Sequence, residues 1–588
     1  MRALSTVLLA SAVVICGALP AAAGSSGPSG PSSVTTAEHK RERRLPPGHE
    51  VTPDSIRFQH RTLRYGSAEE ADLVAGPLAD VPGHLRSYLQ PSPTRPMYAG
   101  GVVLAARNGV VPVHDAAGYA LRYADVDEEL PADERVPMRE DTIFDLASLT
   151  KTFTTIAVLQ QVEDGAVSLD EPVATYLPAF AAHGKGTVTI RDLLTHTGGL
   201  PAWIPLYSAY DTVQERLAAV LAVEPDAAPG EQYVYSDLSL ITLGLVVEEV
   251  TGQKLDDVVA RRITRPLGMR DTMYNPPASL VPRIAATEAQ PWAGRPMIRG
   301  EVHDENAWSL GGVAGHAGLF STAHDLGVLA QTLLNGGKYG AARILEKDTV
   351  RAMLVNQTEQ FPGDSHGLGF ELDQRWYMDA LSSPVTFGHT GFTGTSLVVD
   401  PLSHSFVVLL TNRVHPSRDW GSNNLSRRMM ARDLARAVPI RPAQGQDAWF
   451  SGIGDARTAT LTLALQAPAT SPSRLDFELW YDTEADYDTV TLESSSDGGE
   501  SWTPVPYTLR TGSHVEQSDG TVSGFGGREW HDATALLEPA TEATLLRWRY
   551  SSDGGYQGRG VYVDALRLDH RKVPADALVG DGWRVSTS

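Results

Sequence analysis

The tetrad Ser148-Leu149-Thr150-Lys151 spaces a hydroxyl and an amine so that they meet on one face of a helix. A serine hydroxyl is a weak nucleophile until a base takes its proton, and a lysine amine can be that base if its pKa is held down. A serine at the start of a helix also faces the positive end of the helix dipole, which favours negative charge there. Two fixed residues also occur together by chance, so the tetrad needs support from its surroundings.

The surroundings of the tetrad predict a strand that runs into a helix. Residues 143–146 form an extended apolar lead-in, and Ile156, Leu159 and Val162 recur at helical spacing after it. A strand-to-helix turn is a place where a nucleophile can be presented, so Ser148 is the candidate nucleophile.

The composition limits the classes of protein to which the chain can belong. The chain has 588 residues, enough for two or three domains, and its 42% hydrophobic and 20% charged residues are ordinary for a globular protein. A formal net charge of -22 argues against nucleic acid as a partner. Arginine outnumbers lysine and alanine is frequent, which is typical of a GC-rich bacterial genome.

Residues 1–23 are typical of a secretory signal peptide, with Arg2 before an apolar stretch and a small-residue cleavage site at residues 21–23. A membrane anchor is the alternative, but the run is short and soon meets Pro20. The only cysteine, Cys16, lies inside this segment, so the mature chain is expected to have no disulfide. No later stretch reaches the length of a membrane span, and we expect a secreted, extracellular bacterial protein.

Residues 24–56 are rich in Ser, Gly and Pro and then basic, which predicts a disordered linker. Residues 57–440 then carry strands at both ends and helices between. The expected strands are 101–106 and 110–113, joined by an Asn108-Gly109 turn, and 396–400 and 405–411. The expected helices are 212–224, 238–263 with a break at Gly252, 323–334 and 422–437. This predicts one sheet closed by both ends of the domain, with a helical region inserted.

Residues 445–572 show the period-two pattern of an all-β sandwich, with Ser-Asp-Gly-Gly turns at 496–499 and 552–555. Four of its acidic residues could bind calcium or form a solvated acidic loop: Asp482, Glu484, Asp486 and Asp488. Three of its tryptophans could stack on a sugar or belong to the core: Trp480, Trp502 and Trp530.

Two further motifs follow the tetrad in chain order, Tyr235-Ser236-Asp237 and His389-Thr390-Gly391. The tripeptide His-Thr-Gly also occurs at His196, where it follows a predicted helix, and there we interpret it as a helix cap.

The three ordered motifs resemble those of the serine β-lactamase and penicillin-binding protein superfamily, which includes class C β-lactamases, D-Ala-D-Ala carboxypeptidases and related esterases. The resemblance covers about residues 60–437 and extends to the phrases at 189–200, 266–269 and 302–320. It implies an α/β (α+β) fold of the β-lactamase/transpeptidase type, an antiparallel sheet with flanking helices, and no metal or cofactor. The C-terminal region resembles the jelly-roll modules of secreted bacterial hydrolases.

The resemblance also implies a role for each matching residue. Ser148 would become acylated, Lys151 and Tyr235 would share the general-base work, and Tyr235 would help to activate the deacylating water. The backbone N–H groups of Ser148 and Phe392 would form the oxyanion hole. Two residues would line the strand along which a peptide-like substrate lies: Thr390 and Gly391.

Two positions depart from the pattern of the family. Asp237 stands where asparagine is frequent, and His389 stands where lysine is frequent. We expect Asp237 to raise the pKa of His389 or Lys151, which would shift base work from Lys151 to Tyr235. Both changes favour a peptidase or an esterase over a strong β-lactamase.

The sequence therefore predicts a secreted serine hydrolase that forms an acyl-enzyme at Ser148. Its expected substrates are D-amino-acid peptides of the cell wall (peptidoglycan), β-lactams or small esters, and no nucleic acid is expected as partner. The alternative from another class is a catalytically silent protein that binds the cell wall through its sandwich.

Overall fold

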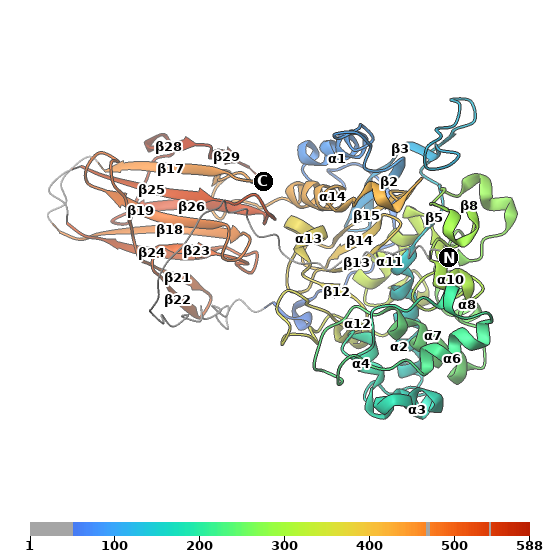
Figure 1. The fold of residues 1–588 in the computed structure, drawn as a ribbon. Coiled ribbons are helices and arrows are strands. Elements are labelled where there is room, and N and C mark those ends of the chain that lie inside the picture. Colours follow the sequence, from blue (N-terminus) through green and yellow to red (C-terminus); the bar gives the residue numbers. More distant parts are fainter. Residues whose placement is uncertain (1–50, 466–470, 540–542, 588) are drawn as a thin grey trace, which may run out of the picture. The chain divides into compact units, whose positions relative to one another are not determined.

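The computed structural model describes residues 51–465, 471–539 and 543–587 (Figure 1). The predicted signal peptide, Cys16 and the linker up to residue 50 lie outside the described residues. The last part of the predicted linker is structured, contrary to expectation, because Pro53–Ser55 forms a 3-10 turn and Ile56 is buried in the main core. An apolar side chain that packs in this way fixes the backbone around it.

One large sheet organises the catalytic region, and it draws its strands from both ends of that region as predicted. Neighbouring strands pair antiparallel, except that β1 and β3 are parallel. The order across the sheet is β1 (Arg64–Tyr65), β3 (Val110–Leu121), β2 (Gly100–Arg107), β15 (Ser405–Thr411), β14 (Thr395–Asp400), β13 (Phe387–Gly391) and β12 (Glu371–Leu372).

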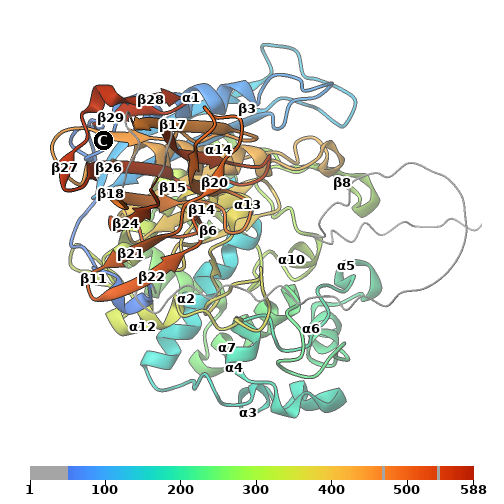
Figure 2. The ribbon, with the colours of Figure 1, turned by 90° about the vertical axis from the view of Figure 1, so that its left-hand side faces the viewer.

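Both faces of this sheet are buried, because apolar side chains of the central strands point to both sides of the sheet. On β2, Val102 and Leu104 join one core cluster while Val103 and Ala105 join the other. Helices α1 (Ala75–Ser87) and α14 (Asn424–Ala437) cover one face, whereas α11 (Ala323–Leu334) covers the opposite face (Figure 1). The turned view in Figure 2 also shows α1 and α14 side by side.

The inserted region supplies the elements that approach the candidate nucleophile. Its helices include α2 (Thr150–Glu163), α4 (Ile190–Leu194), α6 (Val213–Leu221), α7 (Asp237–Thr251), α8 (Leu255–Val259), α10 (Glu305–Ser309) and α12 (Lys347–Met353). The predicted break at Gly252 is confirmed, because this residue ends α7 with a φ of 63°. Helix α7 packs on α2, so the second motif lies beside the first.

The C-terminal region is all-β, as expected, and consists mainly of two antiparallel sheets. The first contains β22 (His514–Ser518), β21 (Tyr507–Thr511), β24 (His531–Leu537), β18 (Ser473–Asp482), β26 (Gly560–Leu568), β16 (Ala448–Phe450) and β29 (Arg584–Ser586). The second contains β20 (Thr503–Pro504), β19 (Thr489–Ser495), β25 (Thr544–Ser551), β17 (Thr458–Leu465) and β28 (Leu578–Asp581). Phe477 of the first sheet and Trp548 of the second lie in one core cluster, so the sheets form a sandwich. Trp480 is buried, as the core interpretation requires, while Trp502 and Trp530 are half-buried.

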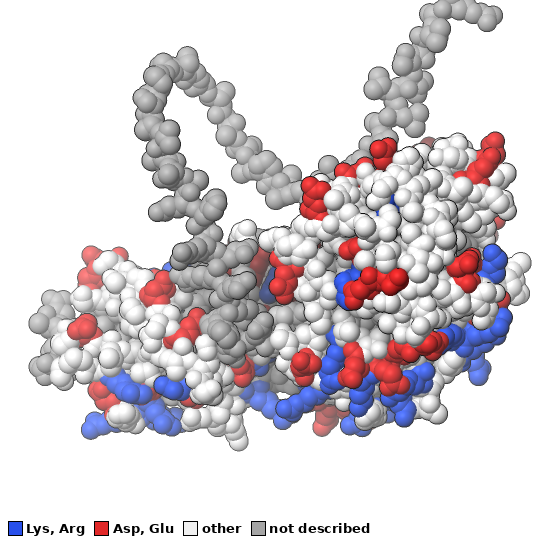
Figure 3. All heavy atoms as spheres, turned by 90° about the horizontal axis from the view of Figure 1, so that it is seen from below, with Lys and Arg blue, Asp and Glu red and all other residues white. Residues whose placement is uncertain are grey.

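The surface agrees with the acidic composition. Figure 3 shows acidic side chains spread over one face of the described residues, with basic ones gathered among them along one edge. In the described residues, no helix combines the length and the apolar character that a membrane crossing needs.

A buried charge cluster at Glu288 leads to a prediction about stability. Glu288 lies 2.8 Å from His303 Nε2 and 2.7 Å from Arg418 Nη2. Burial alone would raise the pKa of Glu288, but its hydrogen bonds to His303 and Arg418 outweigh burial and lower the pKa from 4.5 to about 2. We expect Glu288→Gln to lower the free energy of unfolding by about 3–5 kcal/mol at pH 7, because it removes the buried carboxylate that binds Arg418 and His303.

The same cluster predicts a loss of stability in acid. A carboxyl with a lowered pKa stabilises the fold above its unfolded value of 4.5, and this contribution disappears as the pH falls from 4.5 to about 2. Urea unfolding of the wild type, Glu288→Gln and the exposed control Glu249→Gln across this range measures the effect. Equal stability of all three proteins at pH 7 would refute the prediction.

Candidate active site

Ser148 lies at a strand-to-helix turn, as the sequence predicts. Strand β5 (Phe144–Asp145) leads into a 3-10 turn at Ala147–Leu149, and α2 begins at Thr150. Ala147 has a φ of 46°, and its N–H donates to Asp145 Oδ1 at 2.8 Å. A left-handed conformation is strained for alanine, so the surrounding bonds hold this turn in place. The result is a half-buried serine between two buried neighbours.

Lys151 lies directly behind the nucleophile and is 1% exposed. Its Nζ is 2.7 Å from Ser148 Oγ, 2.8 Å from Asp237 Oδ1 and 3.3 Å from the carbonyl oxygen of His316. The contacts with Ser148 and His316 are hydrogen bonds that the ammonium donates, and the contact with Asp237 is an ion pair. Burial lowers the pKa of Lys151, but the charge of Asp237 and the phenol of Tyr235 outweigh it and raise the pKa above its usual value. The predicted effect of Asp237 on Lys151 is therefore confirmed, and the resting lysine is protonated.

Tyr235 completes the group around the nucleophile. Its ring lies 4.7 Å from Lys151 Nζ, and its hydroxyl interacts with Lys151 and Ser148. The tyrosine precedes α7, where Ser236 caps the helix and its hydroxyl donates to the Pro201 carbonyl at 2.7 Å. Burial, only partly offset by Lys151, raises the pKa of Tyr235 to about 12. The phenol is therefore neutral and can accept one proton while it donates another.

His389 lies on β13 and is 1% exposed, with its ring centroid 6.0 Å from that of Tyr235. Its Nδ1 donates to the carbonyl of Thr390 at 2.7 Å. Burial foremost, and then the charge of Lys151, lower the pKa of His389 to about 3. The expectation that Asp237 raises this pKa is wrong, because desolvation and the nearby ammonium dominate. His389 is neutral and offers no fixed positive charge to a substrate carboxylate.

The third motif is joined directly to the turn that carries Ser148. Thr393 Oγ1 donates to the carbonyl of Asp145 at 2.7 Å, and Thr395 Oγ1 donates to the carbonyl of Leu146 at 3.0 Å. Gly391 is required here, since a side chain would clash with the Leu146 carbonyl. Phe392 follows at the surface, 42% exposed. Its N–H and that of Ser148 thus belong to adjoining segments, and their role as an oxyanion hole stays a prediction, as does substrate contact by Thr390 and Gly391.

His196 supports the site, which the sequence interpretation as a helix cap missed. It does end α4, with a φ of 58°, but its ring also lies 4.7 Å from the ring of Tyr235. Its Nδ1 accepts the N–H of Ser236 at 3.1 Å. The repeated His-Thr-Gly tripeptide was the available signal, because both copies place their histidine ring near the ring of Tyr235.

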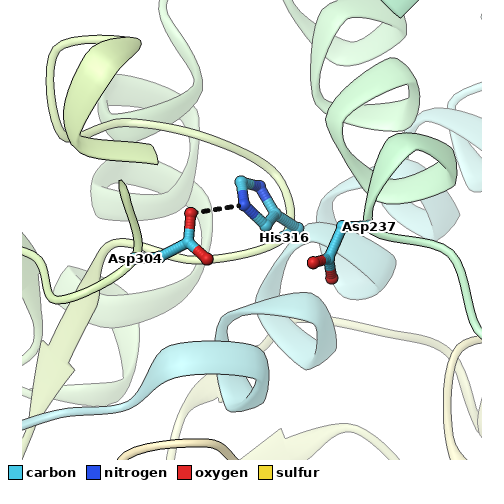
Figure 4. A group of neighbouring side chains, drawn as sticks. All are labelled: Asp237, Asp304 and His316. Atoms are coloured by element: carbon cyan, nitrogen blue, oxygen red, sulfur yellow. Dashed lines mark hydrogen bonds and ion pairs between the residues drawn. The ribbon is translucent and has the colours of Figure 1, made fainter. Parts of the chain in front are cut away.

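The pair of half-buried Asp304 and buried His316 was also missed. His316 Nε2 lies 3.0 Å from Asp304 Oδ1, and the His316 ring lies between Asp304 and Asp237 (Figure 4). Asp304 also caps α10 by accepting the N–H of Ala307 at 2.7 Å. Burial raises the pKa of Asp304, but His316 outweighs it and lowers that pKa well below its usual range. The pair comes from the 302–320 phrase, which the resemblance singled out without a role.

The donor atoms of Asp237, Asp304 and His316 lie within 4.8 Å of one another, a grouping that could hold a metal ion. Lys151 already contacts Asp237 through its ammonium, so a metal cation here would meet a like charge at short range. The arrangement is better explained as a support for Lys151, which also donates a hydrogen bond to the backbone carbonyl of His316.

The Lys151–Asp237 pair leads to a prediction about pH dependence. Asp237→Asn removes the charge that raises the pKa of Lys151, so the lysine should lose its proton at lower pH than in the wild type. If the ammonium stabilises negative charge on Ser148 Oγ, kcat/KM should fall about tenfold per pH unit above the lowered pKa. The exposed control Asp257→Asn should keep the wild-type profile. If kcat/KM of Asp237→Asn instead increases as the pH rises through the lowered pKa of Lys151, neutral Lys151 is the base.

Comparisons with known proteins match the chain in two parts. The family model "Beta-lactamase" matches residues 85–432, and "Immune inhibitor A-like, MAM domain" matches residues 423–576. A protein of Escherichia coli (strain K12) named for D-alanyl-D-alanine carboxypeptidase activity is 36% identical over 345 residues, which cover 53% of this chain and 78% of the relative. A similarly named protein of Salmonella typhi is 34% identical over 346 residues, with the same two coverages.

Solved structures with a similar fold include EstCE1, a hydrolase with promiscuous acyltransferase activity, at 24% identity and a TM-score of 0.49, covering 63% of this chain and 99% of that one. A penicillin-binding protein homologue from Caulobacter crescentus is 21% identical with a TM-score of 0.48, covering 61% of this chain and 97% of that one. The family model spans more than half of the 588 residues. The chain therefore belongs to the beta-lactamase family and is a serine hydrolase with the β-lactamase/transpeptidase-like fold, followed by a C-terminal β-sandwich.

Proposed function

We propose that this hydrolase forms an acyl-enzyme at Ser148 and cleaves D-amino-acid peptides of the bacterial cell wall. The observation that carries the proposal is the 2.7 Å contact between Lys151 Nζ and Ser148 Oγ, with Tyr235 at the same oxygen. The relatives named for D-alanyl-D-alanine carboxypeptidase activity, 78% of whose length is matched, support the substrate class. Secretion rests on the predicted signal peptide at residues 1–23.

The protonation states favour a relay in which Lys151 stays charged. Ser148 Oγ attacks the substrate carbonyl carbon and gives its proton to the Tyr235 oxygen, while Tyr235 gives its own proton to the nitrogen of the departing amine. The Lys151 ammonium stabilises the negative charge that develops on Oγ as the new C–O bond forms. The C–N bond then breaks and leaves an ester on Ser148. A water then attacks the ester carbon and gives a proton to Tyr235. Tyr235 gives its own proton to Ser148 Oγ as the bond between Oγ and the ester carbon breaks and the acid leaves.

An esterase is the second candidate, and the state of His389 favours it. A neutral, buried histidine at this position supplies no charge for the terminal carboxylate of a peptide. An ester substrate needs no such charge, and its alkoxide leaving group needs only the proton from Tyr235.

Parallel assays on one preparation separate the candidates. The wild type and Ser148→Ala are incubated with an acylated peptide that ends in D-Ala-D-Ala, and separately with a nitrophenyl ester. Release of D-alanine by the wild type alone is the expected result. Ester cleavage without D-alanine release would assign the esterase, and no turnover of either substrate would favour the silent wall-binding protein.

A further inference from the structure

Three carboxylates gather at one end of the sandwich, far along the chain from Ser148. Glu484 and Asp488 lie in the loop after β18, and Asp553 lies in the loop after β25. Their oxygen atoms lie within 4.8 Å of one another. Of the four acidic residues that the sequence singled out, two are not members: Asp482 pairs with Arg528 at 3.2 Å, and Asp486 is exposed.

Asp488 of this group is buried, Glu484 is half-buried and Asp553 is exposed, and none of them has a basic partner in the described part of the chain, whereas several other buried acids do. Asp379 pairs with Arg432 at 2.9 Å, and Glu493 pairs with Arg549 at 3.0 Å. Within residues 51–465, 471–539 and 543–587, none of the three clustered carboxylates forms an ion pair. The charge of Arg375 does act on Glu484 and Asp488, but its guanidinium donates to the Gln557 carbonyl at 3.3 Å.

Asp488 has a buried carboxylate oxygen whose surroundings indicate a bound ligand. Its side chain is fully buried, and its Oδ1 accepts the N–H of Asp553 at 3.1 Å. Its Oδ2 is buried without a hydrogen-bond partner in the described part of the chain. An unpartnered buried carboxylate oxygen is costly, and it is explained if a cation occupies the space beside it.

The neighbouring backbone holds the other two carboxylates in place and leaves room beside them. Tyr556 N–H donates to Glu484 Oε2 at 3.1 Å, and Gly555 N–H donates to Asp553 Oδ1 at 2.6 Å. A side chain at Gly555 would begin 2.9 Å from Asp553 Oδ1 and 3.3 Å from Glu484 Oε2. The glycine therefore keeps the space next to both carboxylates open.

We propose that Glu484, Asp488 and Asp553 bind a hard divalent cation, calcium, which ties the loop after β18 to the loop after β25. All donors are oxygen atoms, and carboxylates from two loops suit the flexible, oxygen-only coordination of calcium.

The test uses the full chain, first stripped with a chelator and then titrated with calcium or magnesium by calorimetry, with thermal unfolding in parallel. We expect calcium to bind the wild type and the exposed control Asp486→Asn and to raise the unfolding midpoint of both. Binding to Asp488→Asn and to Asp553→Asn should be at least about 100-fold weaker.

A folding defect would be visible separately. In chelator, Asp488→Asn should unfold no earlier than the wild type, because it removes a buried charge that lacks a partner. Absence of calcium binding by the wild type, magnesium binding in place of calcium, or undiminished binding by both variants would overturn the proposal.

Discussion

Ser148→Ala is expected to abolish turnover of every substrate of this hydrolase, with a fall in kcat of at least about 10³-fold. The alanine variant keeps the backbone of the turn at 147–149 but has no atom that can form the ester. The remaining activity would come only from substrate binding and charge stabilisation. Steady-state kinetics with the peptide and ester substrates measure the loss.

The fold of the Ser148→Ala variant must be intact for this result to count. Its thermal unfolding midpoint should match that of the wild type, because the hydroxyl is half-buried and its loss opens little space. A variant that is fully folded and still turns over the substrates would show that another residue is the nucleophile.

Tyr235→Phe is expected to lower kcat by about 10²- to 10⁴-fold, the range that a general acid–base group contributes. The change removes one hydroxyl and keeps the ring that lies against His196 and Lys151. Because Lys151 is already protonated, no other group in contact with Ser148 Oγ can take its proton as readily. The reduction should therefore appear in kcat more than in KM.

Tyr233→Phe is the matched control for Tyr235→Phe. Tyr233 is also a half-buried tyrosine, two residues earlier, but its hydroxyl lies 3.5 Å from His366 Nδ1. We expect its loss to change kcat by less than about tenfold. Equal effects of the two substitutions would mean that Tyr235 has no special role in proton transfer.

Much of the fold could be predicted because local patterns determine it. The Asn108-Gly109 turn has the positive φ values of 54° and 79° that this dipeptide favours, and it joins two strands as expected. The break after α7 follows from Gly252 in the same way. Strands β21 and β22 were not predicted, because only three of their ten residues are buried and their apolar pattern is weak.

The site could be predicted only in part, for reasons that concern distance and burial. Ser148 and Lys151 are neighbours along one helix, so their contact follows from spacing. His196 and His316 reach the site from segments 48 and 168 residues after Ser148, and no local pattern reports such a contact. The pKa of His389 could not be inferred either, because it depends on desolvation by the assembled site.

The central claim is a covalent acyl-enzyme at Ser148, and intact-mass spectrometry tests it most directly. The wild type and Ser148→Ala are mixed with a penicillin or a slow ester, quenched with acid at successive times and weighed. We predict one acyl adduct per chain in the wild type, located by peptide mapping to the segment that contains Ser148, and none in Ser148→Ala. Turnover by the wild type with no adduct at any time, or an adduct that persists in Ser148→Ala, would contradict the account.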